Sequence, residues 1–295
     1  MTRLDEETVK KVSQKLKKID SQIRDFSGSS FNEICRGSDY FDNQVDPSKK
    51  KTAAVPVTEE LGEISGFSET VSEILNYLGF NSAHVDESDV LGFSKAIKKK
   101  PDLVFMADND QFISYNTKTN SFVGNDTATA RGYSILTKET IKKNNLSNIL
   151  LIGLGNVGLS ILKFLTQTET SILQETEEIF VHDKKEKKIK KAKTIEKNIK
   201  PLKKSKPSEI DLIIDVTPVK NPINLKEKKN HNLFTIQPGV PPGFSPNSNP
   251  SNNSNSNSNS SSSFGGEVEL KSFHDPLAIG VGSMAFMALN NWRKR

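Results

Sequence analysis

Three glycines with the spacing G-x-G-x-x-G are the clearest sign of chemistry in this sequence. Gly153, Gly155 and Gly158 follow an apolar run and precede an apolar helix that we expect to begin near Val157. The first glycine allows a tight turn, the second lets the backbone approach a pyrophosphate, and the third lets the helix pack closely on the strand. The N–H groups at the start of the helix favour phosphate oxygens. The pattern predicts a dinucleotide site formed by Gly153, Leu154, Gly155, Asn156, Val157 and Gly158.

The ends of three later strands are predicted to face the same ligand. Residues 177–183 should form a strand that ends at Asp183, whose carboxylate can bond both ribose hydroxyls and repel a 2′-phosphate. This favours NAD, although two lysines at 184–185 leave NADP open. Buried strands within 210–222 and 232–243 come next. Because open α/β sheets bind ligands at the carboxyl ends of their strands, we expect further cofactor contacts at Thr217, Pro218, Pro238 and Gly239.

A second candidate site lies in the segment 102–116. An apolar strand leads to Asp108, Asn109 and Asp110, and a second strand-like run follows. Asp and Asn are common turn residues, so one interpretation is a plain hairpin. The other is a functional carboxylate, Asp108, at the end of a strand.

Alternating helices and strands are predicted ahead of the glycine motif, and they must position these residues. Periodicity and end signals predict helices over 4–27, 68–80 (with Ser68 as N-cap) and 87–100, strands at 51–58, 82–85 and 102–108, and a connecting segment with a helix over 124–145. Such alternation is typical of an α/β fold with parallel strands.

Two α/β domains therefore account for the chain. We expect a smaller N-terminal substrate and lid domain over 1–140 and a C-terminal Rossmann dinucleotide-binding domain over 141–295, with the active site in the cleft between them. Every residue from 245 to 263 is Ser, Asn or Pro, so we expect a disordered insertion there.

The positive net charge of the 295-residue chain has a local origin. The net charge is +5, but Lys184–Lys206 alone holds 12 Lys against 2 Glu, so the rest of the chain is acidic. This run has no aromatic residue for base stacking and no Arg for bidentate base contacts. We interpret it as a solvated helix face and expect no nucleic-acid partner.

The remaining composition favours a cytoplasmic enzyme without a metal. The lone Cys35 excludes a disulfide within the chain, the N-terminus has no apolar leader, and the apolar stretch 276–289 is too short to span a bilayer. The histidines are scattered and form no ligand motif: His84, His182, His231 and His274.

Eight short blocks, in the same order along the chain, resemble the pyrrolysine synthase family, which acts in the last step of pyrrolysine biosynthesis. The blocks are EICRG (33–37), VPVT (55–58), YLGF (77–80), MADND (106–110), GLGNVG (153–158), TPV (217–219), PGVP (238–241) and DPLAIGVGSM (275–284). The Lys-rich run, the Ser/Asn tract and the basic C-terminus depart from the family but fall between the blocks.

This resemblance implies an NAD-dependent amine oxidation. The substrate would be 3R-methyl-D-ornithyl-Nε-L-lysine, a small molecule with several ammonium groups. Oxidation at the terminal amine carbon, loss of ammonia and closure of a pyrroline ring would give L-pyrrolysine. The family also implies a homodimer.

For the cationic substrate that this resemblance implies, we expect Asp108 to be the catalytic carboxylate, which would pair with a substrate ammonium group and stabilise positive charge at the oxidised carbon. Asn109 and Asp110 are then turn residues. We expect substrate contacts at Leu4, on a first helix that acts as a lid, and at Thr58, Asn125 and Asp275. No general base is evident in the sequence.

Two alternatives stay open at this point. One is another NAD(P)-dependent amine or amino-acid dehydrogenase on the same two-domain frame. The other is a non-enzymatic NAD-sensing or nucleic-acid-binding module that uses the Lys-rich run, which steeply salt-dependent binding would reveal.

Overall fold

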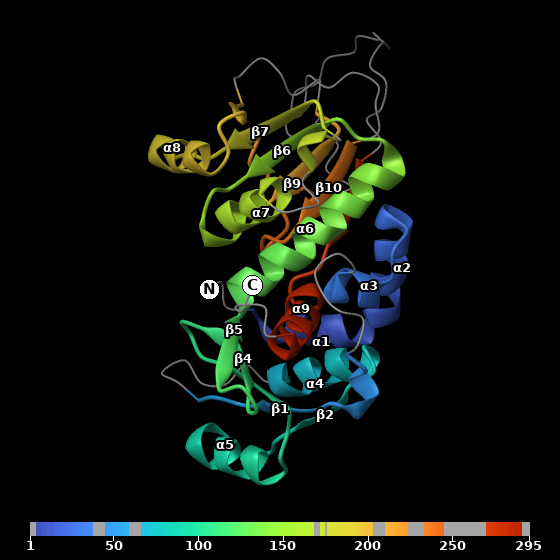
Figure 1. Cartoon of the computed structure of the whole chain (residues 1–295), viewed down its shortest axis with the longest axis vertical. Coiled ribbons are helices and arrows are strands. Elements are labelled where there is room, and N and C mark those ends of the chain that lie inside the picture. The colour runs from blue at the N-terminus through green and yellow to red at the C-terminus, as the bar shows by residue number, and fades with distance from the viewer. Residues whose placement is uncertain are drawn as a thin grey trace, which may run out of the picture. The chain divides into compact units, whose positions relative to one another are not determined.

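The computed structural model describes residues 4–37, 45–58, 66–167, 172–174, 176–202, 210–223, 233–244 and 270–290 (Figure 1). The chain forms two compact units. The first holds Met1–Glu139 together with Asp275–Arg295, and the second holds Thr140–His274. The predicted tract 245–263 and the end of the Lys-rich run lie outside the described residues.

The first unit is a mixed sheet with helices, in the strand order β2-β1-β3-β4-β5. Strands β1, β2 and β3 are parallel, and β3, β4 and β5 form an antiparallel meander, so the predicted hairpin is confirmed. Its elements are α1 (Glu6–Gln14), α2 (Leu16–Ser27), α3 (Phe31–Arg36), η1 (Pro47–Lys49), β1 (Lys51–Val55), α4 (Phe67–Tyr77), β2 (Asn81–His84), α5 (Asp89–Lys98), β3 (Leu103–Ala107), β4 (Phe112–Asn116), β5 (Ser121–Gly124), the first part of α6 (Asn125–Asn144) and α9 (Ala278–Leu289).

The N-terminal helix differs from its prediction. It begins only at Glu6, because the side chain of Asp5 caps it by accepting a hydrogen bond from Thr8 N at 2.7 Å. Leu4 therefore lies before the helix, not on it. The helix is also interrupted at Lys15, whose backbone leaves the helical region, although the apolar spacing continues across the break. Likewise α4 is capped by Gly66, and Ser68 is buried within the helix.

Helix α9 forms the core of the first unit. All of its residues from 278 to 288 are buried, and it packs on α3, α4, β4 and β5. A helix that is apolar on every side is stable only when it is enclosed. This packing groups Asp275–Arg295 with the N-terminal unit, whereas the sequence-based division assigned these residues to the Rossmann domain.

The second unit is a Rossmann fold, which confirms the predicted fold class. In the described part of this unit, six strands are all parallel in the order β11-β10-β9-β6-β7-β8. The order reverses at β6, the strand that carries the glycine motif, and ligands bind at such switch points. The elements are β6 (Asn148–Ile152), α7 (Asn156–Thr166), η2 (Ile172–Gln174), β7 (Glu178–His182), α8 (Glu186–Ile195), β8 (Lys200–Pro201), β9 (Leu212–Asp215), β10 (Leu233–Gln237) and β11 (Leu270–His274).

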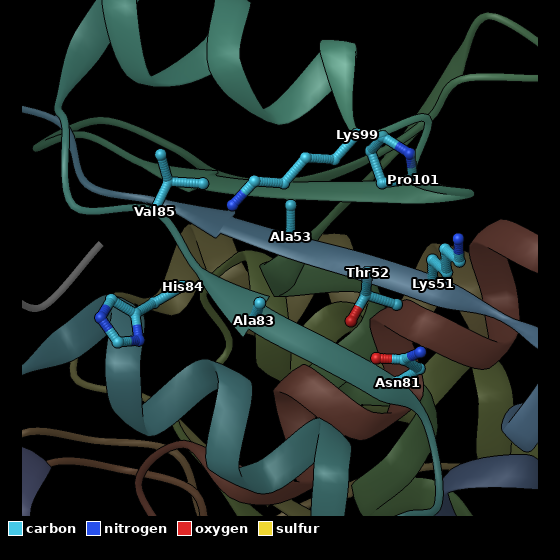
Figure 2. A pocket seen from close by; sticks show the side chains of 9 residues that line it. All are labelled: Lys51, Thr52, Ala53, Asn81, Ala83, His84, Val85, Lys99 and Pro101. Carbon is cyan, nitrogen blue, oxygen red and sulfur yellow. The ribbon is translucent and has the colours of Figure 1, made fainter.

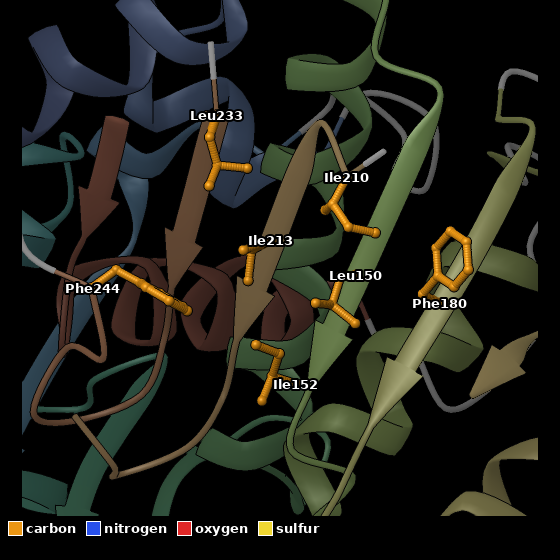
Figure 3. Close-up of a cluster of buried hydrophobic side chains, with 7 residues drawn as sticks. All are labelled: Leu150, Ile152, Phe180, Ile210, Ile213, Leu233 and Phe244. Carbon is orange, nitrogen blue, oxygen red and sulfur yellow. The ribbon is translucent and has the colours of Figure 1, made fainter. Parts of the chain in front are cut away.

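One face of this sheet carries a cluster of buried apolar side chains (Figure 3). Leu150 and Ile152 alternate along β6, as expected for side chains on one face of a sheet, and the other members come from β7, β9, β10 and the segments that flank them. They are Leu150, Ile152, Phe180, Ile210, Ile213, Leu233 and Phe244. The cluster packs β6, β7, β9 and β10 together, and their parallel pairing places their carboxyl ends at one edge.

Candidate functional site

The glycine motif has the geometry that a dinucleotide loop requires. Gly153 has a φ of 90°, and a Cβ there would lie 2.7 Å from Thr217 Cγ2. A Cβ on Gly158 would lie 1.9 Å from the carbonyl oxygen of Gly153, so helix and strand touch backbone to backbone. By contrast, a Cβ on Gly155 would meet nothing within 4 Å. The space at Gly155 is open to a ligand, whereas the other two glycines are needed for packing.

The start of α7 leaves its backbone donors for a ligand. Gly155 is the N-cap and makes no side-chain capping bond. The first N–H groups of a helix have no partner within the helix, so they suit phosphate oxygens. Of the predicted loop residues, Asn156 is exposed, Val157 is half-buried, and Leu154 is fully buried.

Asp183 follows β7 and binds the glycine loop directly. Its Oδ2 accepts a hydrogen bond from Leu154 N at 2.8 Å, and its Oδ1 accepts one from Lys185 N at 2.8 Å. The Lys188 ammonium lies 3.7 Å from Oδ2. Burial raises the pKa of the Asp183 carboxyl, but these N–H groups and Lys188 outweigh it, so the pKa is lowered and the group is ionised at neutral pH.

The loops that follow β9 and β10 meet the glycine loop. Gly239 N donates to the carbonyl oxygen of Asp215 at 3.1 Å. A Cβ on Gly239 would lie 2.2 Å from Thr217 O, and Thr217 in turn packs on Gly153. Three strand ends thus converge, as the sequence predicted, although Pro218 is exposed and Pro238 is half-buried at the rim.

Sequence reasoning missed Asp215, the last residue of β9. It is fully buried, and its Oδ1 accepts hydrogen bonds from the Thr217 N–H at 3.0 Å and the Thr217 hydroxyl at 2.7 Å. The available signal was a carboxylate that ends the apolar run IDLIID just before Thr217.

Strand register brings three predicted substrate residues to one edge of the first sheet. The pairs Val55–Met106, Met106–Ile113 and Ile113–Gly124 form one row across the sheet. Thr58, Asp108 and Asn125 each follow this row at the end of β1, β3 or β5. These strand ends point the same way, because β5 is antiparallel to β4 and β4 to β3.

Asp108 also serves the hairpin. It is exposed, and its Oδ1 accepts hydrogen bonds from Asp110 N at 2.8 Å and Gln111 N at 2.6 Å. One carboxylate oxygen of Asp108 therefore does stabilise the hairpin turn. The exposed position leaves the charge of the group accessible to a cationic ligand.

The other predicted substrate residues make local contacts. The hydroxyl and N–H of Thr58, which is exposed, donate to the carboxylate of Asp89. Asn125 begins α6, is half-buried, and accepts a hydrogen bond from the Thr129 hydroxyl at 3.2 Å. A Cβ on Gly280 would lie 2.6 Å from Asn125 Oδ1, so α9 lies directly against this side chain.

Asp275 is buried, and its carboxylate caps α9. It accepts hydrogen bonds from the N–H groups of Leu277 at 3.3 Å, Ala278 at 3.0 Å and Ile279 at 2.7 Å. Its carbonyl oxygen accepts one from the Tyr133 hydroxyl. The Asp275 carboxylate therefore has a structural role, because it caps the helix that packs against Asn125.

A separate pocket of about 250 Å³ lies along β1 and β2 in the first unit (Figure 2). Lys99 extends over Ala53 there, while Thr52 points to the other side of the strand. None of the predicted site residues lines this pocket, which is formed by Lys51, Thr52, Ala53, Asn81, Ala83, His84, Val85, Lys99 and Pro101. In the described part of the chain, no helix is both long and apolar enough to cross a membrane.

Comparison with known proteins shows similarity to pyrrolysine biosynthesis proteins. Residues 8–123 match the family model described as the N-terminal domain of the pyrrolysine biosynthesis protein PylD. The chain is 25% identical over 278 residues to pyrrolysine synthase of Methanosarcina barkeri (strain Fusaro), with 94% of each chain covered. It is 29% identical over 158 residues to pyrrolysine synthase of Methanosarcina acetivorans, which covers 54% of this chain and 59% of that protein.

The chain also resembles solved structures, two of which are dehydrogenases by title. A shikimate dehydrogenase in complex with NADP⁺ has a TM-score of 0.45 at 11% identity, with 85% of this chain and 92% of that chain covered. Quinate dehydrogenase from Corynebacterium glutamicum in complex with NAD has a TM-score of 0.40 at 9% identity, with 64% and 79% covered.

Proposed function

We propose that this chain, which is similar to pyrrolysine synthase over 94% of its length, is an NAD-dependent oxidoreductase that makes L-pyrrolysine. The substrate is 3R-methyl-D-ornithyl-Nε-L-lysine, which is oxidised at the carbon that bears the terminal amine. Ammonia leaves, and the α-amine of the ornithine part closes the pyrroline ring. The observation that carries this proposal is the similarity itself, which extends over both units and not only over the dinucleotide site.

The residues at the Rossmann edge fit a dinucleotide. The open backbone at Gly155 and the donors at the start of α7 would hold the pyrophosphate, and Asp183 would face the adenosine ribose. The loops with Thr217, Pro218, Pro238 and Gly239 would flank the nicotinamide half. Bound NAD⁺ supplies the hydride acceptor.

The residues at the edge of the first sheet act on the substrate. Asp108 pairs with an ammonium group, and its charge favours the cation that forms at the oxidised carbon. Thr58 and Asn125, at the same edge, orient the amine and the amide linkage. Asp275 holds α9 beneath Asn125, and Leu4 covers the bound substrate. We also propose a cytoplasmic homodimer, which light scattering on the purified protein would test.

The proposal is tested by turnover of the purified full-length chain with NAD⁺ and the synthetic dipeptide-like substrate. We expect NADH absorbance at 340 nm and, by mass spectrometry, a product that has lost ammonia and two hydrogens. Turnover of free ornithine or lysine without this product would instead indicate another amine dehydrogenase. No turnover with any amine, despite NADH binding, would overturn the proposed reaction.

Asp183→Asn should relax cofactor selectivity. We expect the preference for NADH over NADPH to fall about tenfold, because the ionised carboxylate that repels a 2′-phosphate is removed. The ratio of the two dissociation constants, from titrations of cofactor fluorescence, gives the answer. Lys188→Gln is the matched control and should shift the ratio the opposite way, because the cation 3.7 Å from Asp183 Oδ2 is lost. An unchanged ratio in both variants would contradict the role of Asp183.

A further inference from the structure

Asp215 occupies an unusual place for a carboxylate. It ends β9, in the centre of the Rossmann sheet, and pairs in register with Ile152 of β6. By strand alternation it points to the same face as Ile213, onto the apolar cluster shown in Figure 3. No part of its side chain reaches water, since the residue is 0% exposed.

Only one of its two carboxylate oxygens is paired. Oδ1 accepts both hydrogen bonds from Thr217, whereas Oδ2 has no hydrogen-bond partner among the described residues. Oδ2 is enclosed by backbone, because a Cβ on Gly243 would lie 2.0 Å from it. A buried, unpaired negative charge at this point is costly, and a proton on Oδ2 removes that charge.

The electrostatics of the carboxyl group point in the same direction as its geometry. Burial raises the pKa of the Asp215 carboxyl, and the hydrogen bonds from the Thr217 hydroxyl and N–H, which lower it, do not offset this. The burial of Asp215 and its unpaired oxygen thus favour protonation, and the raised pKa agrees in direction.

Three loops of the dinucleotide site are joined at this residue. The Asp215 carbonyl oxygen accepts from Gly239 N, and Asn221 N donates to Gly243 O at 2.8 Å. Thr217, held by Oδ1, packs against Gly153 in turn. A movement of the Asp215 side chain would therefore displace the glycine loop and the loops after β9 and β10 together.

We propose that Asp215 is a positioning residue of the dinucleotide site and acts as a neutral carboxylic acid, which holds Thr217 against the glycine loop and ties the loop after β9 to the loop after β10. This inference rests on the proposed function only in that the bound ligand is NAD. It assigns Asp215 no contact with the substrate.

Other titratable groups stand in the same row or loop and must be separated from Asp215. His182 ends β7, His274 ends β11, and Lys220 lies in the loop after β9. Comparison of the native chain with Asp215→Asn removes their contribution, because they are common to both proteins. Asn is a suitable probe, since it is uncharged, accepts through Oδ1 and donates from Nδ2.

The first measurement is the melting temperature of the cofactor-free chain from pH 5 to pH 9. Because the folded-state pKa lies above the unfolded value, native protein loses stability as the pH rises through the interval between the two values. Asp215→Asn lacks this loss, so the melting temperature of the variant should rise relative to that of native protein as the pH increases through this interval. Parallel curves for the two proteins would overturn the neutral acid.

The second measurement is NADH affinity by fluorescence titration at each pH. We expect Asp215→Asn to bind NADH within about twofold of native protein at low pH, and Asp215→Ala to bind about tenfold more weakly, since it cannot hold Thr217. Asp211→Asn is the matched control at the opposite end of β9, where Asp211 Oδ2 accepts from Ser147 N and Asn148 N. It should leave NADH affinity and its pH profile unchanged.

The outcomes separate this inference from the proposed function. If Asp215→Asn loses as much NADH affinity as Asp215→Ala, an ionised carboxylate is required and the neutral acid is overturned. If native protein binds no NADH, the positioning role and the NAD-dependent reaction both fail, whereas diverging melting curves would still support the buried acid. Normal NADH binding without pyrrolysine formation overturns the reaction alone.

Discussion

Gly158→Ala should strongly weaken dinucleotide binding and destabilise the Rossmann unit. A methyl group at this position would lie 1.9 Å from the carbonyl oxygen of Gly153, so α7 must move away from β6. Overpacking of this kind costs about 1–3 kcal/mol of folding free energy, and more where the obstacle is backbone. Because the same movement displaces the N–H groups at the start of α7, we expect NADH affinity to fall about 100-fold or more.

Gly155→Ala is the matched control. It should lower NADH affinity but leave the melting temperature almost unchanged. A Cβ there meets nothing within 4 Å and φ is −77°, so the melting temperature should stay within about 2 °C of native. The methyl group would project into the space that the pyrophosphate needs, so NADH affinity should still fall about tenfold. Native NADH affinity in either Gly158→Ala or Gly155→Ala would show that this loop does not bind the pyrophosphate.

Local patterns explain why the Rossmann half was predictable. The glycine spacing, the apolar strands and the carboxyl-end residues are all encoded within short windows, and parallel strands must place their ends at one edge. Thr217, Gly239 and Gly153 therefore meet as expected. Asp215 was missed because the sequence around a carboxylate that follows an apolar run does not show whether the group is solvent-exposed or buried. The burial of Asp215 depends on the loop with Gly243, which lies far along the chain.

The N-terminal half shows what a local pattern cannot give. The apolar spacing from Val9 to Ile23 runs on across Lys15, yet the backbone breaks there into two helices. Likewise, nothing in the apolar run 278–288 says that it fills the core of the N-terminal unit, because that depends on packing with α3 and α4. Asp275 was predicted near a ligand from its charge and position, but its oxygens cap α9.

The strand register of the first sheet, in contrast, strengthens the hypothesis that Asp108 binds the substrate. Taken alone, Asp108 fits the role of a turn residue as well as that of a functional carboxylate, and its Oδ1 does accept two backbone hydrogen bonds. The row from Val55 to Gly124 adds that Thr58 and Asn125 follow strands at the same edge. The hairpin bonds and the substrate role are thus separable, since they use different properties of one side chain: an acceptor atom and a charge.

Asp108→Asn separates those properties and should have the largest effect on turnover. The Asn side chain keeps an Oδ1 acceptor for the N–H groups of Asp110 and Gln111, so the melting temperature should stay within about 2 °C of native. The charge that pairs with the substrate ammonium group and favours the developing cation is lost. We expect kcat/KM for the dipeptide-like substrate to fall about 100-fold, with NADH affinity unchanged.

Asp110→Asn is the control, because it removes the same charge two residues away on an exposed turn position. It should lower kcat/KM by no more than about twofold, as expected for a screened surface charge. Asp108→Ala should lose both activity and hairpin stability, since no acceptor remains for the two N–H groups. Equal losses of kcat/KM in Asp108→Asn and Asp110→Asn would indicate a general effect of negative charge near the site. Native turnover in Asp108→Asn would show that Asp108 only stabilises the hairpin.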